Sequence, residues 1–331
     1  MLVVGPNGAG KTNLLESLHV GTQGFSPRTR TDARLVRFGR DAARIHLHGD
    51  RAGVALDLDV TLALGAGKRA TVNGARLSAA EQLRGEVTTL VFTPDRLVLV
   101  KGAPTARRAY FDRVLGRISP ARASLSAEYG GAIAQRNAAL RRAAAGFSTR
   151  DAIAPWTERV AELGQQLAAG RREVIELLSP SFATRAAELR LPAANLRYET
   201  EPVTVEQLEA RLDRDLERGT TGVGPHLDDV ELRSGDRDLR AFGSQGEQRL
   251  TVLALLLAEA ELLKERRGLA PLLLLDDVLS ELDPDRRRIL ADRIRAFGQT
   301  LVTTTSRTAL PTDPDQVVEV SVGADGTSKA A

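Results

Sequence analysis

The 331-residue chain contains no cysteine, a single tryptophan and no long apolar run. The lack of cysteine excludes disulfide bonds, thiolate metal sites and a cysteine nucleophile. No stretch approaches the roughly 18 apolar residues that a membrane-spanning helix requires, and no basic segment precedes a signal-like apolar region at the N-terminus. Composition therefore predicts a cytoplasmic protein with no membrane partner.

Two kinds of side chain are also scarce. Aromatic residues make up 4% of the chain, which argues against a platform for stacking nucleic-acid bases. Lysine occurs five times among 46 basic residues, so 41 are arginine, the better bidentate donor to phosphate. A coding bias in a GC-rich genome explains the same preference. Because the formal net charge is only +3, any surface that binds a polyanion must be local.

The hydrophobic pattern changes twice along the chain. Apolar and polar residues alternate strictly over 54–64, which predicts a half-buried antiparallel strand, and TLVFT at 89–93 is expected to close the same small sheet. From 105 to about 191 the sequence indicates several ordinary helices without a sustained heptad repeat, and a long helix is predicted over 245–267. The expected helix breaks are Pro120, Gly130, Pro155 and Pro180. The resulting segments are 1–104, 105–218 and 219–331.

The segment GPNGAGKT at 5–12 fits the phosphate-binding pattern GxxxxGKT in full. It lies between a predicted strand at 2–4 and a predicted helix at 12–19, as the motif requires. In this motif backbone N–H groups close on the phosphates, Lys11 reaches the outer phosphates, and the Thr12 hydroxyl binds Mg²⁺. The predicted nucleotide-binding residues are Gly5, Pro6, Asn7, Gly8, Ala9, Gly10, Lys11, Thr12 and Asn13.

A second part of the nucleotide site is predicted where the apolar run 272–275 ends in Asp276 and Asp277. A buried parallel strand delivers carboxylates at its carboxyl end in this way. Asp276 is predicted to hold Mg²⁺ through water, and Asp277 to orient or deprotonate the attacking water. The predicted catalytic residues are therefore Asp277 and Lys11. The alternative is a surface strand end with two solvated acids, which the phosphate loop elsewhere in the chain disfavours.

The stretch GSQGEQRL at 243–250 opens a predicted helix, with Ser244 and Glu247 spaced as a capping box. Capping alone explains these two residues, but not Gly246 in the first helical turn, where glycine costs about 1 kcal/mol against alanine. Close approach of a γ-phosphate to the helix N-terminus would require the glycine. The predicted signature motif is Ser244, Gln245, Gly246, Glu247, Gln248 and Arg249.

Other polar groups carry weaker indications. GAGK at 65–68 follows a strand with no helix behind it and is interpreted as a hairpin turn. His46 and His48 share a strand face, and His226 lies near two aspartates, so each group is a minor candidate for a metal site. Arginines after the first helix and around position 107 are candidate DNA-phosphate contacts, with a solvated face as the alternative. The candidates for DNA are Arg28, Arg30, Arg107 and Arg108.

The phosphate loop, SQGEQR and LLLLDDVLSELD together resemble the ATP-binding-cassette (ABC) head of SMC type and, within that class, the RecF family of recombination and repair proteins. TVNG at 71–74, FTPDRLVLVKGAPTARRAYFDRVL at 92–115, QRNAALR at 135–141 and GPHLDD at 224–229 also resemble this family, so the likeness covers essentially the whole chain. The resemblance implies an α/β fold, with a mixed sheet flanked by helices and an inserted helical arm. The first and third segments would form one ATPase lobe, and the second segment the arm.

In heads of this class two subunits sandwich ATP. The resemblance implies that the phosphate loop and acidic strand of one copy face Ser244, Gly246 and Gln248 of another, and that Asp283 belongs to the D-loop. ATP and Mg²⁺ would then support an ATP-dependent homodimer with slow, DNA-dependent hydrolysis as a switch. Family members bind gapped duplex DNA beside single strands and help the RecO and RecR proteins to load RecA. An ABC transporter subunit, another ABC-type chromosome-maintenance ATPase and a small-molecule P-loop kinase are the alternatives.

The chain departs from the wider class at several positions. Asp277 stands where glutamate is usual, which predicts slow turnover. Thr93 and its neighbours stand where related heads carry a glutamine that senses Mg²⁺, and LVTTTS at 301–306 lacks the switch histidine, for which a threonine is the expected substitute. Leu227 replaces an expected arginine in GPHLDD, which is expected to weaken a DNA or intersubunit contact. Because the family has a strand and hairpin before the phosphate loop, we expect the chain to be shortened at its N-terminus.

Overall fold

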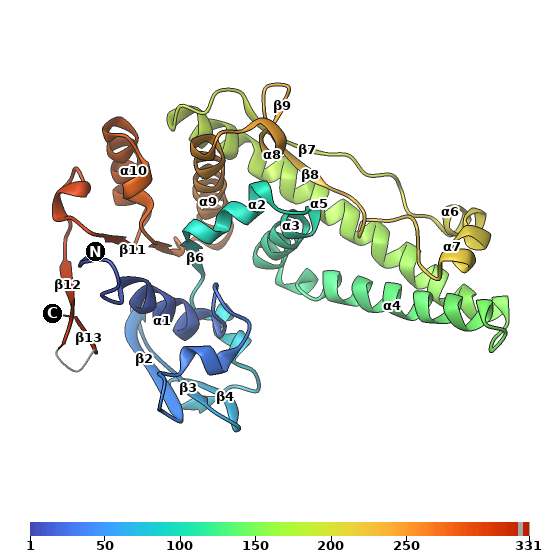
Figure 1. The fold of residues 1–331 in the computed structure, drawn as a ribbon, viewed down its shortest axis with the longest axis horizontal. Coiled ribbons are helices and arrows are strands. Elements are labelled where there is room, and N and C mark those ends of the chain that lie inside the picture. The colour runs from blue at the N-terminus through green and yellow to red at the C-terminus, as the bar shows by residue number, and fades with distance from the viewer. Residues whose placement is uncertain (324–326, 331) are drawn as a thin grey trace. The chain divides into compact units, whose positions relative to one another are not determined.

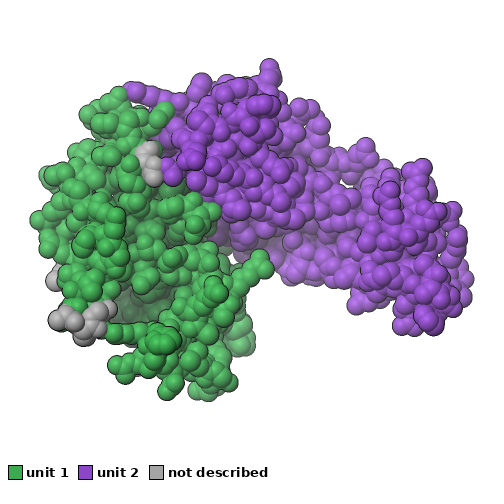
Figure 2. All heavy atoms as spheres, viewed as in Figure 1, with its two compact units in different colours: residues 1–96, 267–331 green, residues 97–266 purple. Residues whose placement is uncertain are grey.

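The computed structural model describes residues 1–323 and 327–330, except for the side chain of Glu281. The chain divides into two compact units, which Figure 2 draws in different colours. Unit 1 comprises residues 1–96 and 267–331, and unit 2 comprises residues 97–266. Each unit contains fully buried apolar side chains, such as Leu274 in unit 1 and Leu140 in unit 2.

Among the described residues, the main sheet of unit 1 has six strands in the order β13-β12-β1-β11-β10-β6. Figure 1 labels β6, β11, β12 and β13 of this sheet. Pairing is parallel throughout except between β12 and β13. The inner strands are short and almost wholly buried, as is usual for parallel sheets. The strands are β1 (Leu2–Val4), β6 (Thr89–Phe92), β10 (Leu272–Leu275), β11 (Thr300–Thr304), β12 (Val317–Val322) and β13 (Ser328–Ala330). The helical segments of this unit are α1 (Lys11–Gln23), η1 (Asp32–Leu35), η2 (Ala80–Gly85), η3 (Pro94–Leu97), η6 (Val278–Glu281), α10 (Pro284–Phe297) and η7 (Arg307–Ala309).

The second sheet of unit 1 is antiparallel, with the strand order β2-β3-β4-β5. Its strands are β2 (Ala42–Arg51), β3 (Val54–Ala63), β4 (Gly67–Val72) and β5 (Ala75–Arg76). The inward residues of β3 pack in one apolar cluster with Val20 of α1, which confirms the alternation predicted there. They are Leu56, Leu58, Val60 and Leu62. The GAGK turn is also confirmed, because it joins β3 to β4 with Gly65 and Gly67 at positive φ.

One strand lies in a different sheet from the one predicted. The sequence pattern assigns 89–93 to the small antiparallel sheet, but β6 pairs in parallel with β10 of the main sheet, with Phe92 opposite Leu275. All four residues of β6 are buried, so this strand lacks the alternation that suits a sheet with one exposed face. The predicted sheet for this segment is therefore wrong.

Unit 2 is mainly helical, with a three-stranded sheet in the order β7-β8-β9 (Figure 1). Its helical segments are α2 (Val98–Lys101), α3 (Pro104–Ile118), η4 (Pro120–Arg122), α4 (Leu125–Ala144), η5 (Arg150–Ile153), α5 (Ala154–Glu188), α6 (Val205–Ala210), α7 (Leu212–Arg218), α8 (Leu239–Phe242) and α9 (Gln245–Arg267). Its strands are β7 (Ala194–Tyr198), β8 (Val230–Ser234) and β9 (Arg237–Asp238). The helix predicted over 245–267 is confirmed as α9.

Helix α5 is longer than the sequence pattern predicts. It runs for 35 residues and continues through Pro180, where a break is expected. A proline inside a helix removes a backbone hydrogen bond and costs about 3 kcal/mol or more. Here Val174, Leu178 and Phe182, which surround the proline on the same helix, are all fully buried. Tertiary packing of the apolar face therefore outweighs the local cost of the proline.

The boundary of the helical unit also differs from the expected 105–218. Residues 219–266 belong to unit 2 rather than to the nucleotide-binding unit. Strand β8 pairs with β7 along five residues. In addition, Glu259 of α9 is fully buried and accepts hydrogen bonds from Tyr110 and Arg117 of α3. These contacts join the third predicted segment to the helices, and the sequence pattern alone does not reveal them.

Candidate nucleotide site

The phosphate loop connects β1 to α1 in unit 1. Gly8 and Gly10 have φ of 80° and 100°, a region that favours glycine, so the loop can close tightly before the helix begins. The Lys11 ammonium is buried and donates hydrogen bonds to the carbonyl oxygens of Gly5 (2.8 Å) and Pro6 (2.9 Å). The loop thus encloses its own lysine, and the same ammonium is the donor that a phosphate would attract.

Strand β10 carries Asp276 to the same edge of the sheet. The Thr12 hydroxyl lies 3.1 Å and 3.0 Å from the two carboxylate oxygens of Asp276, although the two residues are 264 positions apart in the chain. Asp276 is buried, and its backbone N–H donates to the Phe92 carbonyl of β6. Thr12 and Asp276, both predicted Mg²⁺ ligands, therefore lie side by side next to Lys11.

The donor set of this site fits Mg²⁺. Magnesium takes oxygen ligands and usually keeps several of its waters. The Thr12 hydroxyl would bind the ion directly, and the Asp276 carboxylate, whose oxygens lie 3.1 Å and 3.0 Å from that hydroxyl, would hold it through water. Within the described residues, no group of three or more histidine or acidic side chains could hold a metal ion. Mg²⁺ at this site would therefore complete its coordination with nucleotide phosphates and water, which is its usual mode in ATP-binding proteins.

Asp277 adopts an unusual backbone conformation directly after β10. Its φ of 49° and ψ of 30° lie in the left-handed region, which aspartate tolerates better than most residues. The Asp277 N–H donates to Thr303 Oγ1 (2.9 Å), and its carbonyl accepts from Ser280 Oγ (2.9 Å). A strained residue held on both sides is typical of a functional position. The predicted role of Asp277 in orienting water stays a prediction.

Thr303 is a site residue that the sequence reasoning missed. Its hydroxyl donates to Asp276 Oδ1 (2.7 Å) and accepts from Asp277 N–H. The sequence-based interpretation expects a threonine of 301–306 to substitute for the switch histidine, but it names no single threonine and no contact with Asp276 or Asp277. The only sequence signal is an apolar strand that ends in threonines. The register with the Asp276 strand, which brings the hydroxyl and the carboxylate together, appears only in the structure.

The signature motif lies in unit 2, at the start of α9. Ser244 N–H donates to Glu247 Oε2 (2.8 Å) and Glu247 N–H donates to Ser244 Oγ (3.2 Å), so the predicted capping box is confirmed. Arg237 also donates to Glu247 (2.9 Å). The Ser244 N–H, and then Arg237, hold the pKa of the Glu247 carboxyl below its ordinary value. Glu247 is therefore an ionised brace for the helix N-terminus.

No side chain of the described residues packs against Gly246 on the exposed side of the motif. A Cβ added to Gly246 would meet nothing closer than the Ser244 hydroxyl at 4.0 Å, and both residues are exposed. Packing within the chain therefore does not explain the glycine. Gln248, in contrast, is 3% exposed and donates to the Leu239 carbonyl (2.9 Å), so its side chain points into unit 2 instead of toward an external ligand. Arg249 is half-buried.

Asp283, the predicted D-loop residue, begins α10. Its carboxylate accepts a hydrogen bond from the Arg286 N–H (2.9 Å) and pairs with the Arg286 guanidinium (3.0 Å). Pro284 follows at the first helical position, which is the preferred place for proline in a helix. Asp283 therefore caps this helix whatever else it contacts.

Comparison with known proteins identifies the class to which these motifs belong. The sequence profile of the RecF/RecN/SMC N terminal domain family matches residues 1–329. A curated DNA replication and repair protein RecF from Geobacillus thermodenitrificans is 36% identical over 321 residues, which covers 92% of this chain and 86% of the relative. The chain belongs to the RecF family. A RecF protein from a Synechococcus strain is 38% identical over 322 residues, with 92% and 84% coverage.

Solved structures give the same family and confirm the predicted fold class. RecF–ATP, described as a recombination mediator protein in the RecFOR pathway, has a TM-score of 0.85 at 27% identity, over 100% of this chain and 91% of that chain. An SMC head bound to the C-winged helix domain of ScpA has a TM-score of 0.59 at 18% identity, over 100% and 88% of the two chains, which is a likeness of fold. No helix within the described residues is long and apolar enough to cross a bilayer.

The predicted DNA contacts of this RecF-family chain differ in their accessibility. Arg107 is 2% exposed and forms a bidentate pair with Asp229 (both 2.7 Å), while its remaining nitrogen donates to two backbone carbonyls. The prediction of Arg107 as a DNA contact is therefore wrong, because every nitrogen of its guanidinium is used internally. Arg108 is partly exposed and donates to the Asp228 carbonyl. Arg28 pairs with Glu16 (3.3 Å) yet stays partly exposed, and Arg30 is exposed.

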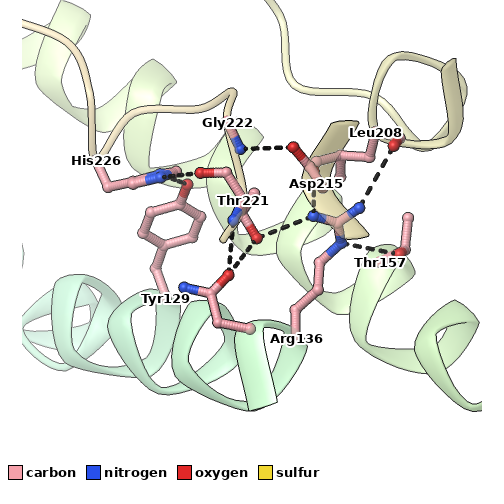
Figure 3. Close-up of polar contacts among 9 residues, drawn as sticks. Tyr129, Arg136, Thr157, Leu208, Asp215, Thr221, Gly222 and His226 are labelled. Atoms are coloured by element: carbon pink, nitrogen blue, oxygen red, sulfur yellow. Dashed lines mark hydrogen bonds and ion pairs between the residues drawn. The ribbon is translucent and has the colours of Figure 1, made fainter. Parts of the chain in front are cut away.

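The family-like stretches QRNAALR and GPHLDD meet in unit 2, in the polar network of Figure 3. Arg136 and Asp215 form an ion pair (2.8 Å) with both side chains at most 1% exposed. Thr221 accepts from Arg136 (2.9 Å), and its carbonyl accepts from His226 Nε2 (3.1 Å). Because a carbonyl only accepts, Nε2 carries the proton, and Nδ1 accepts from the Tyr129 hydroxyl (2.8 Å). The imidazole is thus used for structure and is not available as a metal ligand.

The GPHLDD turn is held in place at both ends. Arg171 donates to the Pro225 carbonyl and Tyr198 donates to Asp228 Oδ2 (2.6 Å). Burial, followed by the hydrogen bond to Asp228, raises the pKa of Tyr198 to about 12. Leu227 is the exception in this turn, with 58% of its surface exposed. The expected effect of leucine at this position on a DNA or intersubunit contact stays a prediction.

Proposed function

We propose that the chain is an ATP-dependent DNA-binding protein of recombinational DNA repair, in which ATP binding drives the pairing of two copies. The observation that carries the proposal is the convergence of Lys11, Thr12 and Asp276 at one edge of the parallel sheet. A lysine beside a carboxylate–hydroxyl pair is the donor set that a nucleoside triphosphate with Mg²⁺ requires. The RecF relative of known structure is described as ATP-bound, which supports ATP as the nucleotide.

The exposed signature motif supports the pairing of two copies. Ser244 and Gly246 are exposed at the N-terminus of a 23-residue helix, where backbone N–H groups and the helix dipole attract an anion. We assign this anion as the γ-phosphate of ATP bound to the phosphate loop of a second copy. A nucleotide shared between two chains makes their association depend on ATP, and its hydrolysis would reverse that association.

Hydrolysis is proposed to be slow. Asp277 is the side chain assigned to hold the attacking water, and its carboxylate is one methylene shorter than the glutamate of the wider class. When bound, Mg²⁺ supplies positive charge next to the phosphate oxygens. Lys11 would bind the outer phosphates, and Thr12 and Asp276 would hold the metal ion. Slow hydrolysis would then set the lifetime of the DNA-bound state.

We assign DNA-backbone binding to the arginine-rich segment 28–44, which comprises most of the loop after α1 and the start of β2. Between positions 28 and 44 it exposes several arginines and carries only two acidic residues, so its local charge is strongly positive. The arginines are Arg28, Arg30, Arg34, Arg37, Arg40 and Arg44. Contacts to phosphates do not read sequence, so a preference for gapped duplex would come from DNA shape. The description of the solved relative as part of the RecFOR pathway supports RecO and RecR as partners. RecA loading is the outcome that we propose for this assembly.

Sedimentation velocity of the purified chain tests the assembly directly. We expect a monomer without nucleotide, a dimer with ATP and Mg²⁺, and a larger complex when gapped duplex DNA is added. A dimer that is indifferent to ATP would contradict the proposal.

The salt dependence of DNA binding tests the assignment of the segment 28–44. Replacing Arg30, Arg34 and Arg40 by alanine should flatten the plot of log affinity against log salt by about 0.9 for each phosphate that the variant no longer neutralises. The matched control replaces the exposed arginines Arg159, Arg172 and Arg197 of unit 2 and should leave the slope unchanged. If the two triple variants changed the slope equally, the assignment of DNA binding to the segment 28–44 would be wrong.

A further inference from the structure

The threonine at the end of β11 makes a contact to which the nucleotide-binding motifs assign no role. Thr303 is 1% exposed, and its Oγ1 lies 2.7 Å from Asp276 Oδ1 and 2.9 Å from the backbone nitrogen of Asp277. A carboxylate only accepts and an N–H only donates, so the direction of both hydrogen bonds is fixed. One buried hydroxyl therefore connects the two acidic residues of the site.

This contact is built by strand register and not by a flexible loop. Leu275 of β10 lies opposite Val302 of β11, so Asp276 and Thr303 are the next residues along two paired strands. On the other side of β10, the Asp276 N–H donates to the Phe92 carbonyl (2.9 Å). The backbone of Asp276 is thus fixed by β6 and its side chain by β11, which is the kind of rigid support that a metal ligand needs.

Thr303 acts differently on the two acidic residues. For Asp276, it binds Oδ1 and so fixes the rotation of the carboxylate that also faces Thr12. For Asp277, it accepts the N–H of a residue in the left-handed backbone region (φ 49°), which is otherwise unfavourable for a side chain with a Cβ. Removal of the hydroxyl would remove the hydrogen bonds that orient the Asp276 carboxylate and the Asp277 backbone at the same time.

We propose that Thr303 is a positioning residue of the nucleotide site, which orients Asp276 for Mg²⁺ and fixes the backbone from which Asp277 projects. This inference deepens the proposed function and rests on it. It predicts that loss of the hydroxyl weakens ATP binding in the presence of Mg²⁺ and does not change ATP binding in the absence of Mg²⁺. Loss of such a supporting hydrogen bond typically lowers metal affinity about 10–100-fold.

The test compares Thr303→Val with Thr303→Ser. The affinity for a fluorescent ATP analogue is measured over a Mg²⁺ titration and in excess EDTA, and the increase in melting temperature with ATP is measured under the same conditions. Thr303→Val should raise the midpoint of the Mg²⁺ titration at least about tenfold and leave binding in EDTA unchanged. Thr303→Ser keeps the hydroxyl and should stay close to the wild type. Thr303→Ala, compared with Thr303→Ser, isolates the hydroxyl again if the valine variant fails to fold.

Thr304→Val is the matched control. Thr304 is the adjacent buried threonine of β11, and within residues 1–323 and 327–330 its hydroxyl bonds to the backbone of Ser306 alone. Adjacent strand residues point to opposite faces of the sheet. A Mg²⁺ midpoint for Thr303→Val equal to that of Thr304→Val would overturn the inference while the proposed function stands. A wild-type chain whose ATP binding ignores Mg²⁺ would overturn the proposed function and the inference with it.

Discussion

The hydroxyl of Thr12 and the carboxylate of Asp276 lie 3.0 Å apart although 264 residues separate them in the chain. The chain leaves the sheet after β6, forms the whole of unit 2, and returns with β10 as the neighbour of β6. A parallel sheet brings the carboxyl ends of its strands to one edge, so the phosphate loop and the acidic strand meet there. The nucleotide site therefore depends on a pairing between strands from the two ends of the chain.

Lys11→Met should remove nucleotide binding without unfolding unit 1. Among the described residues the ammonium bonds to the carbonyls of Gly5 and Pro6 alone, and methionine is an unbranched side chain that fills a similar space. We expect the rise in melting temperature on addition of ATP and Mg²⁺ to disappear, while the melting temperature without ligand changes little. A variant that retains the full ATP-induced shift would show that Lys11 is not a phosphate ligand.

Asp277→Asn should separate binding from hydrolysis. Asparagine tolerates the left-handed backbone at this position, so the turn after β10 should be preserved. Its amide cannot accept a proton from water, and loss of such a group typically lowers the rate about 100-fold or more. Equilibrium ATP binding and single-turnover hydrolysis, measured on the same sample, test whether binding is retained and whether hydrolysis is slowed. Wild-type turnover in the variant would remove Asp277 from the reaction.

The buried pair of Arg136 and Asp215 should control the stability of unit 2 (Figure 3). Arg136→Met leaves an unpaired buried carboxylate, and breaking a buried pair in this way typically costs about 3–5 kcal/mol. The double variant Arg136→Met/Asp215→Leu removes both charges and should recover a large part of the loss. Urea denaturation followed by a probe in unit 2 gives the midpoints. A double variant no more stable than the single one would contradict this explanation.

His226 should make unit 2 less stable in mild acid. Burial lowers the pKa of its imidazole below the ordinary value of 6.5. The unfolded chain therefore binds a proton at a higher pH than the folded chain, and the free energy of unfolding decreases as the pH falls below about 6.5. Glutamine can still donate to Thr221 and accept from Tyr129, so His226→Gln should melt with a smaller dependence on pH between about 7.5 and 5. If the melting temperatures of the wild type and His226→Gln changed equally with pH, His226 would not be the source of the acid sensitivity.

Sequence patterns predict the local parts of this site well. The phosphate loop, the strand 272–275 and helix α9 are each specified by residues close together in the chain, so their periodicity and turn chemistry suffice. The capping box of Ser244 and Glu247 is predicted for the same reason. What these motifs share is that each is complete within a few helical turns or one strand.

Features that depend on distant contacts are predicted poorly. The short apolar run of β6 fits either sheet, and only its pairing with β10 decides the matter. Pro180 breaks a helix locally, but the buried face of α5 overrides it. Arg107 has the composition of a DNA contact, yet Asp229, 122 positions away, binds it internally. Thr303 is missed because its importance lies wholly in its neighbours on the adjacent strand.

The central claim is that two copies of the chain build each nucleotide site together, and mixing two inactive variants tests it most directly. Lys11→Met removes the phosphate loop lysine and leaves the signature motif intact, whereas Ser244→Arg blocks the signature motif and leaves the phosphate loop intact. If the sites are shared, each variant alone should be inactive, and an equal mixture should regain up to about a quarter of wild-type ATP hydrolysis, because half of the dimers then contain one complete site. A mixture as inactive as its two components, or a Ser244→Arg variant that hydrolyses ATP alone, would contradict the shared site.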